Sequence, residues 1–269
     1  MRRFAKKLLA TIAPQWTTAL LSARARAHSQ RVIAGWGNGP AARKLIARLG
    51  SRVQSGPFQG LLLTQMTHAE QFGPYLLGVY ESHLEEAWNT VLRRSYTQVI
   101  DIGAKFGYYA VGLAIRYPQA SVVAFDTDWW ARKAVRQMAA ANGTGNVEVR
   151  GFCTPEWLAA NTRAGAFIIS DCEGYEAALF QPAVVAQLRS ATLIVETHDV
   201  FVPGVSGALR SVFGETHTVL DIDPGATPRS APCALDFLTE PERRLVVQEV
   251  RADQVWLLCL PRAGPNAQT

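Results

Sequence analysis

Beyond residue 97 the sequence alternates short apolar runs with longer stretches of helical periodicity, and this alternation limits the fold more than any other feature. Helices are expected over about 107–117 and over 131–142, the second closing at Gly143. The expected strands occupy 99–100, 122–125, 147–149, 166–169, 192–195, 216–220 and 254–258. Several are apolar throughout, as is typical of parallel strands covered on both faces. The pattern predicts an α/β fold with a doubly wound, mostly parallel sheet of seven strands.

Charge divides the chain into two unequal regions. Residues 1–69 contain 11 Lys and Arg but no Asp or Glu, whereas residues 70–269 hold 16 basic and 22 acidic side chains, a net charge of −6. We expect a basic, helical N-terminal extension over 1–69 and the sheet domain over 70–269. Residues 1–31 fit one or two cationic helices, which either lie on an anionic surface or pack on the domain. The loop 35–40 is the best linker candidate.

The cysteines and the apolar runs bear on location. Four cysteines lie far apart, without a zinc-type pattern, which favours a reduced, intracellular chain. No apolar run approaches the roughly 18 residues that span a bilayer. The basic start resembles a secretory signal but lacks a clean cleavage site, so we expect a cytoplasmic protein. Weak contact with an anionic membrane through residues 1–34 and organellar targeting stay open as alternatives.

Ligands of doubly wound sheets bind at the carboxyl ends of the strands, and the first strand ends in an informative motif. Asp101 is followed by glycines at 103 and 107, but Lys105 stands where a dinucleotide-binding loop requires its second glycine. Asp126 ends the second strand, where an acid can bind a ribose diol. These residues together favour an adenosine-containing cofactor without a pyrophosphate.

The fourth and fifth strands end in titratable groups. Asp171, Glu173 and Glu176 follow the fourth strand, and Glu196 and His198 follow the fifth. His198 is a candidate general base, although a hydrogen-bonded structural histidine fits the sequence equally well. The acids and His198 could hold a divalent ion, but nothing in their spacing demands one, and we predict no metal.

Several ordered motifs resemble one family. They are the run from Val99 to Tyr109, the run Ala124-Phe125-Asp126, the run from Asp171 to Glu176, the run from Ile194 to His198, and the stretch from Leu76 to Glu81. This series is similar to the FkbM-type branch of class I S-adenosylmethionine-dependent methyltransferases and covers about 74–222. The resemblance implies a Rossmann-like fold, with 70–269 as the cofactor-binding domain.

The resemblance also implies roles for individual residues. Asp101, Gly103, Ala104 and Gly107 would cradle the amino-acid end of S-adenosylmethionine, Asp126 would hold the ribose, and Phe152 and Cys153 would lie by the adenine. Glu81 and Asp171 complete the expected cofactor set. Trp129 either stacks on the adenine or packs within the protein.

The resulting functional prediction is methylation of an oxygen on a small-molecule or glycan-like acceptor. We expect His198 to accept the proton, with Glu196, Asp171 and Glu173 beside it, and the loop over 224–241 to cover the acceptor. The fourth strand lacks the Pro-Pro run of nucleobase methyltransferases, and few aromatics interrupt the basic segment, so nucleic acid is not the expected partner. Two alternatives are a nicotinamide-dependent oxidoreductase and a membrane- or nucleic-acid-binding protein with a non-catalytic core.

Overall fold

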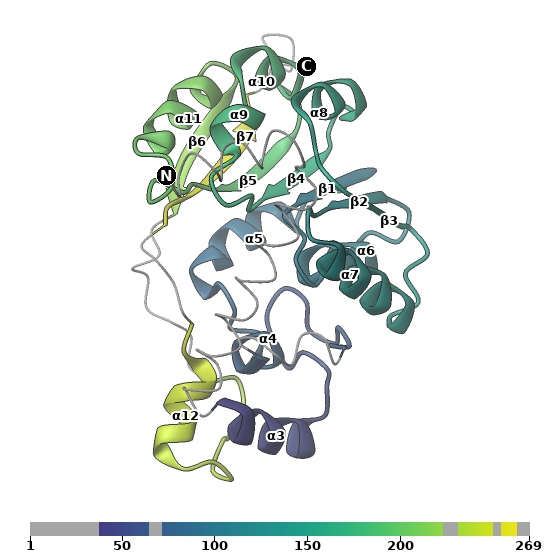
Figure 1. Cartoon of the computed structure of the whole chain (residues 1–269), viewed down its shortest axis with the longest axis vertical. Helices are drawn as coiled ribbons and strands as arrows, with labels where there is room; N and C mark the ends of the chain where they lie inside the picture. The colour runs from purple at the N-terminus through teal and green to yellow at the C-terminus, as the bar shows by residue number, and fades with distance from the viewer. Residues whose placement is uncertain (1–37, 65–71, 223–230, 250–253, 263–269) are drawn as a thin grey trace, which may run out of the picture.

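The computed structural model describes residues 38–64, 72–222, 231–249 and 254–262. Its centre is a seven-stranded sheet in the order β3-β2-β1-β4-β5-β7-β6 (Figure 1). The strands are β1 (Gln98–Ile102), β2 (Ser121–Phe125), β3 (Val147–Arg150), β4 (Phe167–Ser170), β5 (Thr192–Glu196), β6 (His217–Ile222) and β7 (Trp256–Pro261). Strands β1 to β5 pair in parallel, and β7 runs antiparallel between β5 and β6. The predicted fold class is therefore confirmed.

Alternate residues of the central strands feed two hydrophobic cores, because successive side chains of a strand point to opposite faces. In β1, for example, Val99 belongs to one core and Ile100 to the other. Helices α5 (Glu85–Val91), α6 (Tyr108–Arg116) and α7 (Trp129–Ala141) contribute to the first core. Helices α8 (Pro155–Asn161), α9 (Glu176–Leu179), α10 (Pro182–Gln187) and α11 (Val205–Gly214) contribute to the second. Both faces of the sheet are thus covered (Figure 1).

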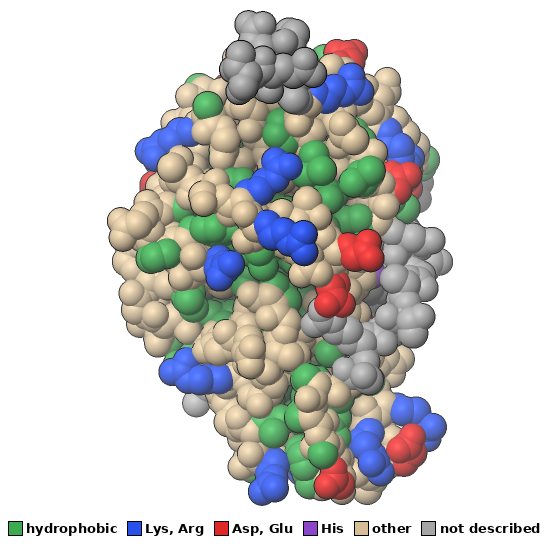
Figure 2. Space-filling model, turned by 180° about the vertical axis from the view of Figure 1, so that it is seen from behind, with side chains coloured by type: hydrophobic (Ala, Val, Ile, Leu, Met, Phe, Trp, Pro, Cys, Tyr) green, Lys and Arg blue, Asp and Glu red, His purple; other side chains and the backbone are tan. Residues whose placement is uncertain are grey.

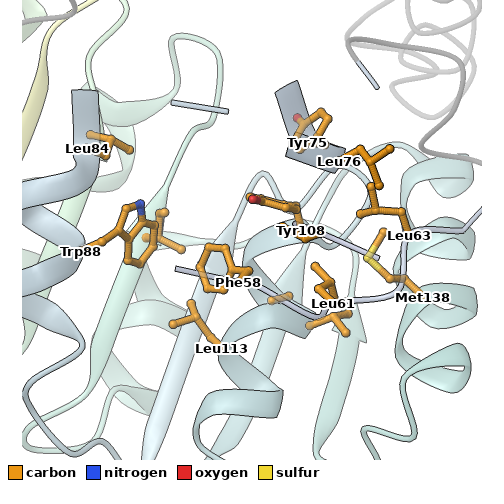
Figure 3. Packing of buried hydrophobic residues seen from close by; sticks show 14 of the residues in the cluster. Phe58, Leu61, Leu63, Tyr75, Leu76, Leu84, Trp88, Tyr108, Leu113 and Met138 are labelled. Carbon is orange, nitrogen blue, oxygen red and sulfur yellow. The ribbon is translucent and has the colours of Figure 1, made fainter. Parts of the chain in front are cut away.

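Residues 51–63, which precede the sheet in the sequence, pack on its first helical layer. Phe58 lies against Gly112 of α6, where an added Cβ would come within 2.3 Å of its ring, and it meets Trp88 and Tyr108 edge to face. Figure 3 shows Leu61 and Leu63 beside Met138 of α7. The Asn142 side chain also bonds both the N–H and the C=O of Leu62, at 2.9 Å each. This part of the expected extension therefore shares the core of the sheet domain, and the boundary at residue 69 stays a prediction.

A second group of helices lies at the bottom of Figure 1, and its buried side chains join the first core, as Tyr75 does against Tyr108 of α6. It contains α3 (Asn38–Leu49), α4 (Phe72–Leu77) and α12 (Glu240–Val247), while the short helix η2 (Ser82–Leu84) leads into α5. Helix α12 packs against α3 and α4, and a Cβ on Gly73 would lie 2.2 Å from the carbonyl oxygen of Val246. Helix α3 begins within the expected linker over 35–40, since proline is tolerated in a first helical turn. Of the expected acceptor-covering loop over 224–241, residues 231–239 lie outside helices and lead into α12, which already contains residues 240–241.

The surface and the helices bear on the membrane and nucleic-acid alternatives. On the face seen in Figure 2, the described Lys and Arg side chains are dispersed among acidic and hydrophobic ones. Among the described residues, no helix has the length and apolar character to cross a membrane. The predicted cationic helices of residues 1–31 lie outside the described residues.

Candidate active site at the carboxyl edge of the sheet

The turn after β1 is held tightly against its two neighbouring strands. Gly103 has φ +88°, and a Cβ there would lie 1.7 Å from the backbone oxygen of Asp171, so only glycine fits. The N–H groups of Gly103 and Ala104 both donate to the carbonyl oxygen of Phe125, at 2.9 Å. Gly107, also at φ +88°, then begins α6. The turn is therefore fixed at the point where β1, β2 and β4 meet.

Asp126 joins the turn after β1 to the end of β2. Its Oδ2 accepts the N–H of Lys105 and its Oδ1 accepts the N–H of Asp128, both at 2.8 Å. Burial raises the pKa of Asp126 to about 6, although these two N–H groups oppose the shift. Lys105 takes φ +47°, which presents its N–H to the carboxylate. The structure thus brings Asp126 and the glycine turn together.

Asp101 is a buried acid below the turn, with 2 % of its surface exposed. Its Oδ2 is buried and has no hydrogen-bond partner in the described part of the chain. Burial, with the nearby Asp126, Asp171 and Glu81 carboxylates, raises the pKa of Asp101 to about 8. An orphaned carboxylate oxygen of this kind is strongly stabilised by a cation or a hydrogen-bond donor.

Glu81 lies at the same edge, in a left-handed conformation with φ 50°. Its carboxylate accepts a hydrogen bond from the hydroxyl of Tyr109, and its N–H donates to Oε1 of Glu249 at 2.8 Å. A pocket of about 290 Å³ opens beside Glu81 and is also lined by Tyr80, Glu85 and Trp88. Glu249 was not among the site residues predicted from the sequence. Nothing near it in the sequence marks it, because it follows α12 and reaches the sheet only through the tertiary fold.

His198 stands at the centre of four carboxyl groups. Its Nδ1 lies 2.5 Å from Oε1 of Glu176, while its Nε2 lies 3.4 Å from Asp171 Oδ1, 3.7 Å from Glu173 Oε2 and 3.7 Å from Glu196 Oε2. The histidine is 1 % exposed, and Glu176 is fully buried. The four predicted catalytic residues are therefore brought together, and Glu176 joins them. Its position in the run from Asp171 to Glu176 could have identified it.

The charges of this cluster set the protonation of His198. Burial would lower its pKa, but the Asp171 and Glu176 carboxylates outweigh burial and raise the pKa to about 10. Burial and the Asp171 charge raise the pKa of Glu196 to about 10 as well. Burial alone would raise the pKa of Asp171, but the interactions with its neighbours, chiefly His198, together have the larger effect and lower that pKa. The ring of His198 consequently keeps its proton near neutral pH and is poorly suited to accept another.

Aromatic side chains border the site on the side of β2 and β3. Phe152 is 53 % exposed and packs on Tyr175 with the ring centroids 4.9 Å apart, whereas Cys153 is buried. Trp129 is 49 % exposed and stacks on Trp130. This contact does not favour either of its expected roles, stacking on the adenine or packing within the protein. Beyond β5, Val200 and Phe201 are exposed, and Phe201 stacks on His198. Exposed apolar groups thus lie on two sides of the acidic cluster.

Comparisons with known proteins find similarity among solved structures, at low sequence identity. No protein-family model matches it, and no curated protein sequence matches it. Similar solved structures include precorrin-6y C5,15-methyltransferase from Geobacter metallireducens, with 13 % identity, 65 % of this chain and 86 % of that chain covered, and a TM-score of 0.42. An O-methyltransferase family protein from Burkholderia thailandensis shares 16 % identity over 74 % of this chain and 61 % of its own, with a TM-score of 0.42. TrmK of M. capricolum, solved with S-adenosylhomocysteine, shares 11 % identity over 64 % and 66 %, with a TM-score of 0.39.

Proposed function

We propose that this chain is an S-adenosylmethionine-dependent methyltransferase of the FkbM type, which methylates an oxygen of a small-molecule or glycan-like acceptor. The observation that carries the proposal is the junction of the glycine turn with Asp126, through the N–H of Lys105 at 2.8 Å. This junction sets a ribose-binding acid directly beside a turn that admits a ligand close to the backbone. Oxygen as the acceptor atom rests on the family resemblance.

The buried acids fit a cationic cofactor. Asp101 offers an orphaned carboxylate oxygen at the turn, and Glu81 places a second buried carboxyl at the same edge. S-adenosylmethionine carries an ammonium group and a sulfonium, and either charge would offset the cost of the buried carboxyls. We assign the amino-acid end to Asp101, Gly103, Ala104 and Gly107, the ribose to Asp126, and the adenine to the edge formed by Phe152 and Cys153.

The same junction argues against a nicotinamide dinucleotide. In a dinucleotide site the backbone N–H groups of the glycine turn face a pyrophosphate. In this chain the N–H of Lys105 already donates to the Asp126 carboxylate, and a side chain occupies the position that must be glycine. A pyrophosphate at the turn would meet negative charge where it needs donors.

Bound S-adenosylmethionine supplies an electrophilic methyl group on a cationic sulfur. The protein has to align the acceptor with that methyl group, exclude water and take up the acceptor proton. His198 is poorly suited to this last task because its pKa lies near 10. We assign the proton to Glu173, whose side chain is 70 % exposed and whose Oε2 lies beside the cluster. The pKa of Glu173 is raised by burial of the side that faces the cluster and by the Asp171 charge. Glu173 is therefore a stronger base than an ordinary Glu.

The apolar rim suits the acceptor. Val200 and Phe201 are 65 % and 58 % exposed, and the Cβ of Phe201 lies 3.0 Å from where a Cβ on Gly174 would be. These side chains stand next to Glu173 on the acceptor side of the cluster. An acceptor with an apolar face and a hydroxyl group would cover them and exclude water from the acids.

The test is calorimetric titration of the chain with S-adenosylmethionine and with its demethylated product. The wild type should bind both, and Asp126→Asn should bind about 10- to 100-fold more weakly through loss of charge-assisted hydrogen bonds. Gly107→Val should also weaken binding, since a Cβ there already meets Val135 at 3.2 Å. Asp221→Asn is the control, because Asp221 of β6 pairs with the exposed side chain of Arg210 from α11. Absence of binding by the wild type would overturn the proposal, as would binding of a nicotinamide dinucleotide in its place.

If the cofactor binds, incubation with labelled cofactor and a metabolite extract should identify the acceptor. A labelled ether or ester would support oxygen as the accepting atom. Label found only on nitrogen or carbon would refute that part of the proposal and leave methyl transfer standing.

A further inference from the structure

We propose that Asp171, Glu196 and His198 form a binding site for one divalent transition-metal ion, such as Mn²⁺ or Zn²⁺. Each of the three offers one ligand atom, and the three atoms lie within 4.8 Å of one another. His198 Nε2 is 3.4 Å from Asp171 Oδ1 and 3.7 Å from Glu196 Oε2. Hydrogen bonds of an imidazole are shorter, at about 2.7–3.2 Å. Ligands about 2.1 Å from a tetrahedral ion are spaced roughly 3.4 Å apart, which is close to the observed separations.

The orientation of His198 suits a metal ligand. Glu176 Oε1 lies 2.5 Å from Nδ1 of His198, the ring nitrogen that faces away from the proposed ion. A carboxylate in this position keeps a proton on Nδ1, so a metal at Nε2 would replace the second proton that the ring carries in the metal-free chain, and metal binding would release that proton. Glu176 is fully buried, so its hold on the ring is shielded from solvent. It would act as a positioning residue outside the ligand set.

Two polar atoms face this space from beyond normal hydrogen-bond distance. The His198 side chain is 1 % exposed, and its Nε2 lies 3.4–3.7 Å from three carboxylate oxygens. Asp171 Oδ1, the nearest of those oxygens, is itself buried and lacks a hydrogen-bond partner within the described ranges. Buried polar atoms seldom remain unpaired, and a shared ion would satisfy both at once.

The ligands are held by rigid elements. Asp171 directly follows β4, and its N–H donates to the Ile102 oxygen at 2.8 Å. Glu196 is the last residue of β5, which pairs in parallel with β4. The N–H of Thr197, between Glu196 and His198, donates to Val255 at 2.9 Å. The three ligand positions are thus fixed by backbone pairing and do not depend on a surface loop.

The donor set selects the class of ion. One imidazole with two carboxylates suits Mn²⁺, Fe²⁺ or Zn²⁺ better than Mg²⁺ or Ca²⁺, which prefer oxygen alone. Three protein ligands leave at least one coordination position open, as in catalytic metal sites. A hydroxyl bound at that position would lose its proton more readily, and Glu173 could receive it. This role rests on the proposed methyl transfer, whereas metal binding does not.

The experiment titrates the full, chelator-treated chain with Mn²⁺ and follows free Mn²⁺ by electron paramagnetic resonance, with Zn²⁺ and Mg²⁺ as competitors. We expect one Mn²⁺ per chain, displaced by Zn²⁺ more readily than by Mg²⁺. Asp171→Asn and His198→Gln should each lower the affinity at least tenfold, and Glu176→Gln about 10- to 100-fold. Asp221→Asn should leave the affinity unchanged. Failure of the wild type to bind at millimolar Mn²⁺ or Zn²⁺ would overturn the site, as would equal affinity in His198→Gln.

A measurement on the wild type covers the case in which variants do not fold. Substoichiometric Mn²⁺ should broaden the imidazole resonances of His198 before those of His217, which is buried and within 3.1 Å of the Ala191 oxygen. Equal broadening of the two would count against the site. Calorimetry with S-adenosylmethionine on the same sample separates the two proposals. Cofactor binding without metal binding removes only the metal site, and metal binding without cofactor binding removes only the proposed methyl transfer.

Discussion

Replacement of Gly103 by alanine tests whether the turn after β1 is as tightly held as the structure indicates. The new Cβ would lie 1.7 Å from the backbone oxygen of Asp171, and the residue would have to keep φ +88°. A carbon and an oxygen in contact are normally about 3.3 Å apart or more. A backbone atom cannot rotate out of the way as a side chain can. The ends of β1 and β4 must therefore separate, or the turn must change its conformation.

The expected cost has three parts. A positive φ in a residue with a Cβ costs on the order of 1–3 kcal/mol. Displacement of packed atoms adds about 1–3 kcal/mol. Separation of the strand ends also threatens the bond from the Asp171 N–H to the Ile102 oxygen, worth about 1 kcal/mol. We expect Gly103→Ala to lower the free energy of unfolding by roughly 3–7 kcal/mol, the sum of these three parts.

Gly143→Ala is the matched control. Gly143 also has a positive φ, +67°, but nothing lies within 4 Å of an added Cβ, so only the backbone cost applies. Urea denaturation of both variants should give a difference of at least about 2 kcal/mol, or about 4–8 °C in melting temperature for a domain of this size. Equal loss of stability in the two variants would refute the tight contact between the turn and Asp171. Gly103→Ala should also lose affinity for S-adenosylmethionine, and Gly143→Ala should keep it.

Three further predictions follow from the site and its support. The pKa of Asp101 is about 8 in the folded chain and near 3.8 in the unfolded chain. Between these two pH values the folded state binds more protons than the unfolded state, so the free energy of unfolding should fall as pH rises from 4 to 8. Asp101→Asn should reduce the loss measured by urea denaturation between pH 5 and 7 by roughly 3 kcal/mol, and an unchanged loss would contradict the raised pKa. Asn142→Ala removes the two hydrogen bonds to Leu62, so it should lower the free energy of unfolding by about 1–3 kcal/mol and speed hydrogen exchange at the Leu62 amide. Asn161→Ala is the control, because it removes a hydrogen bond to Trp157 within α8 and should leave the exchange rate at Leu62 unchanged. Once the acceptor is known, Glu173→Gln should lower kcat about 100-fold or more and abolish the acidic limb of its pH profile, and retention of that limb would exclude Glu173 as the proton acceptor.

Much of the fold could be predicted because local patterns encode it. Each expected strand is present, and the helix expected over 131–142 appears as α7. The position of β7 could not be predicted in the same way. Its apolar run resembles those of the parallel strands, and only its pairing with β5 and β6 sets its antiparallel direction. Pairing between distant segments leaves no periodic signal in either one.

The site was predictable to the extent that strand ends define it. Asp101, Asp126, Asp171 and Glu196 lie where the carboxyl edge was expected, since a strand's last residues can be read from its apolar run. The protonation of His198 could not be predicted, because it depends on which carboxyls surround the ring and how deeply they are buried. The packing of Phe58 on Gly112 was also beyond the sequence, since the early region is distinguished by charge, which says little about where its apolar residues lie.

The contact between α3 and α12 has a consequence for how the chain is made. Lys44 Nζ donates a hydrogen bond of 2.7 Å to Glu242 Oε1, although 198 positions separate the two residues in the sequence. At about 5–20 residues per second, the ribosome completes α12 roughly 10–40 s after α3 has been synthesised. During that interval α3 and α4 lack the cover that α12 gives them in the folded chain. Translation therefore delays the completion of this part of the core, and C-terminal truncations that remove α12, together with β7 after it, should aggregate.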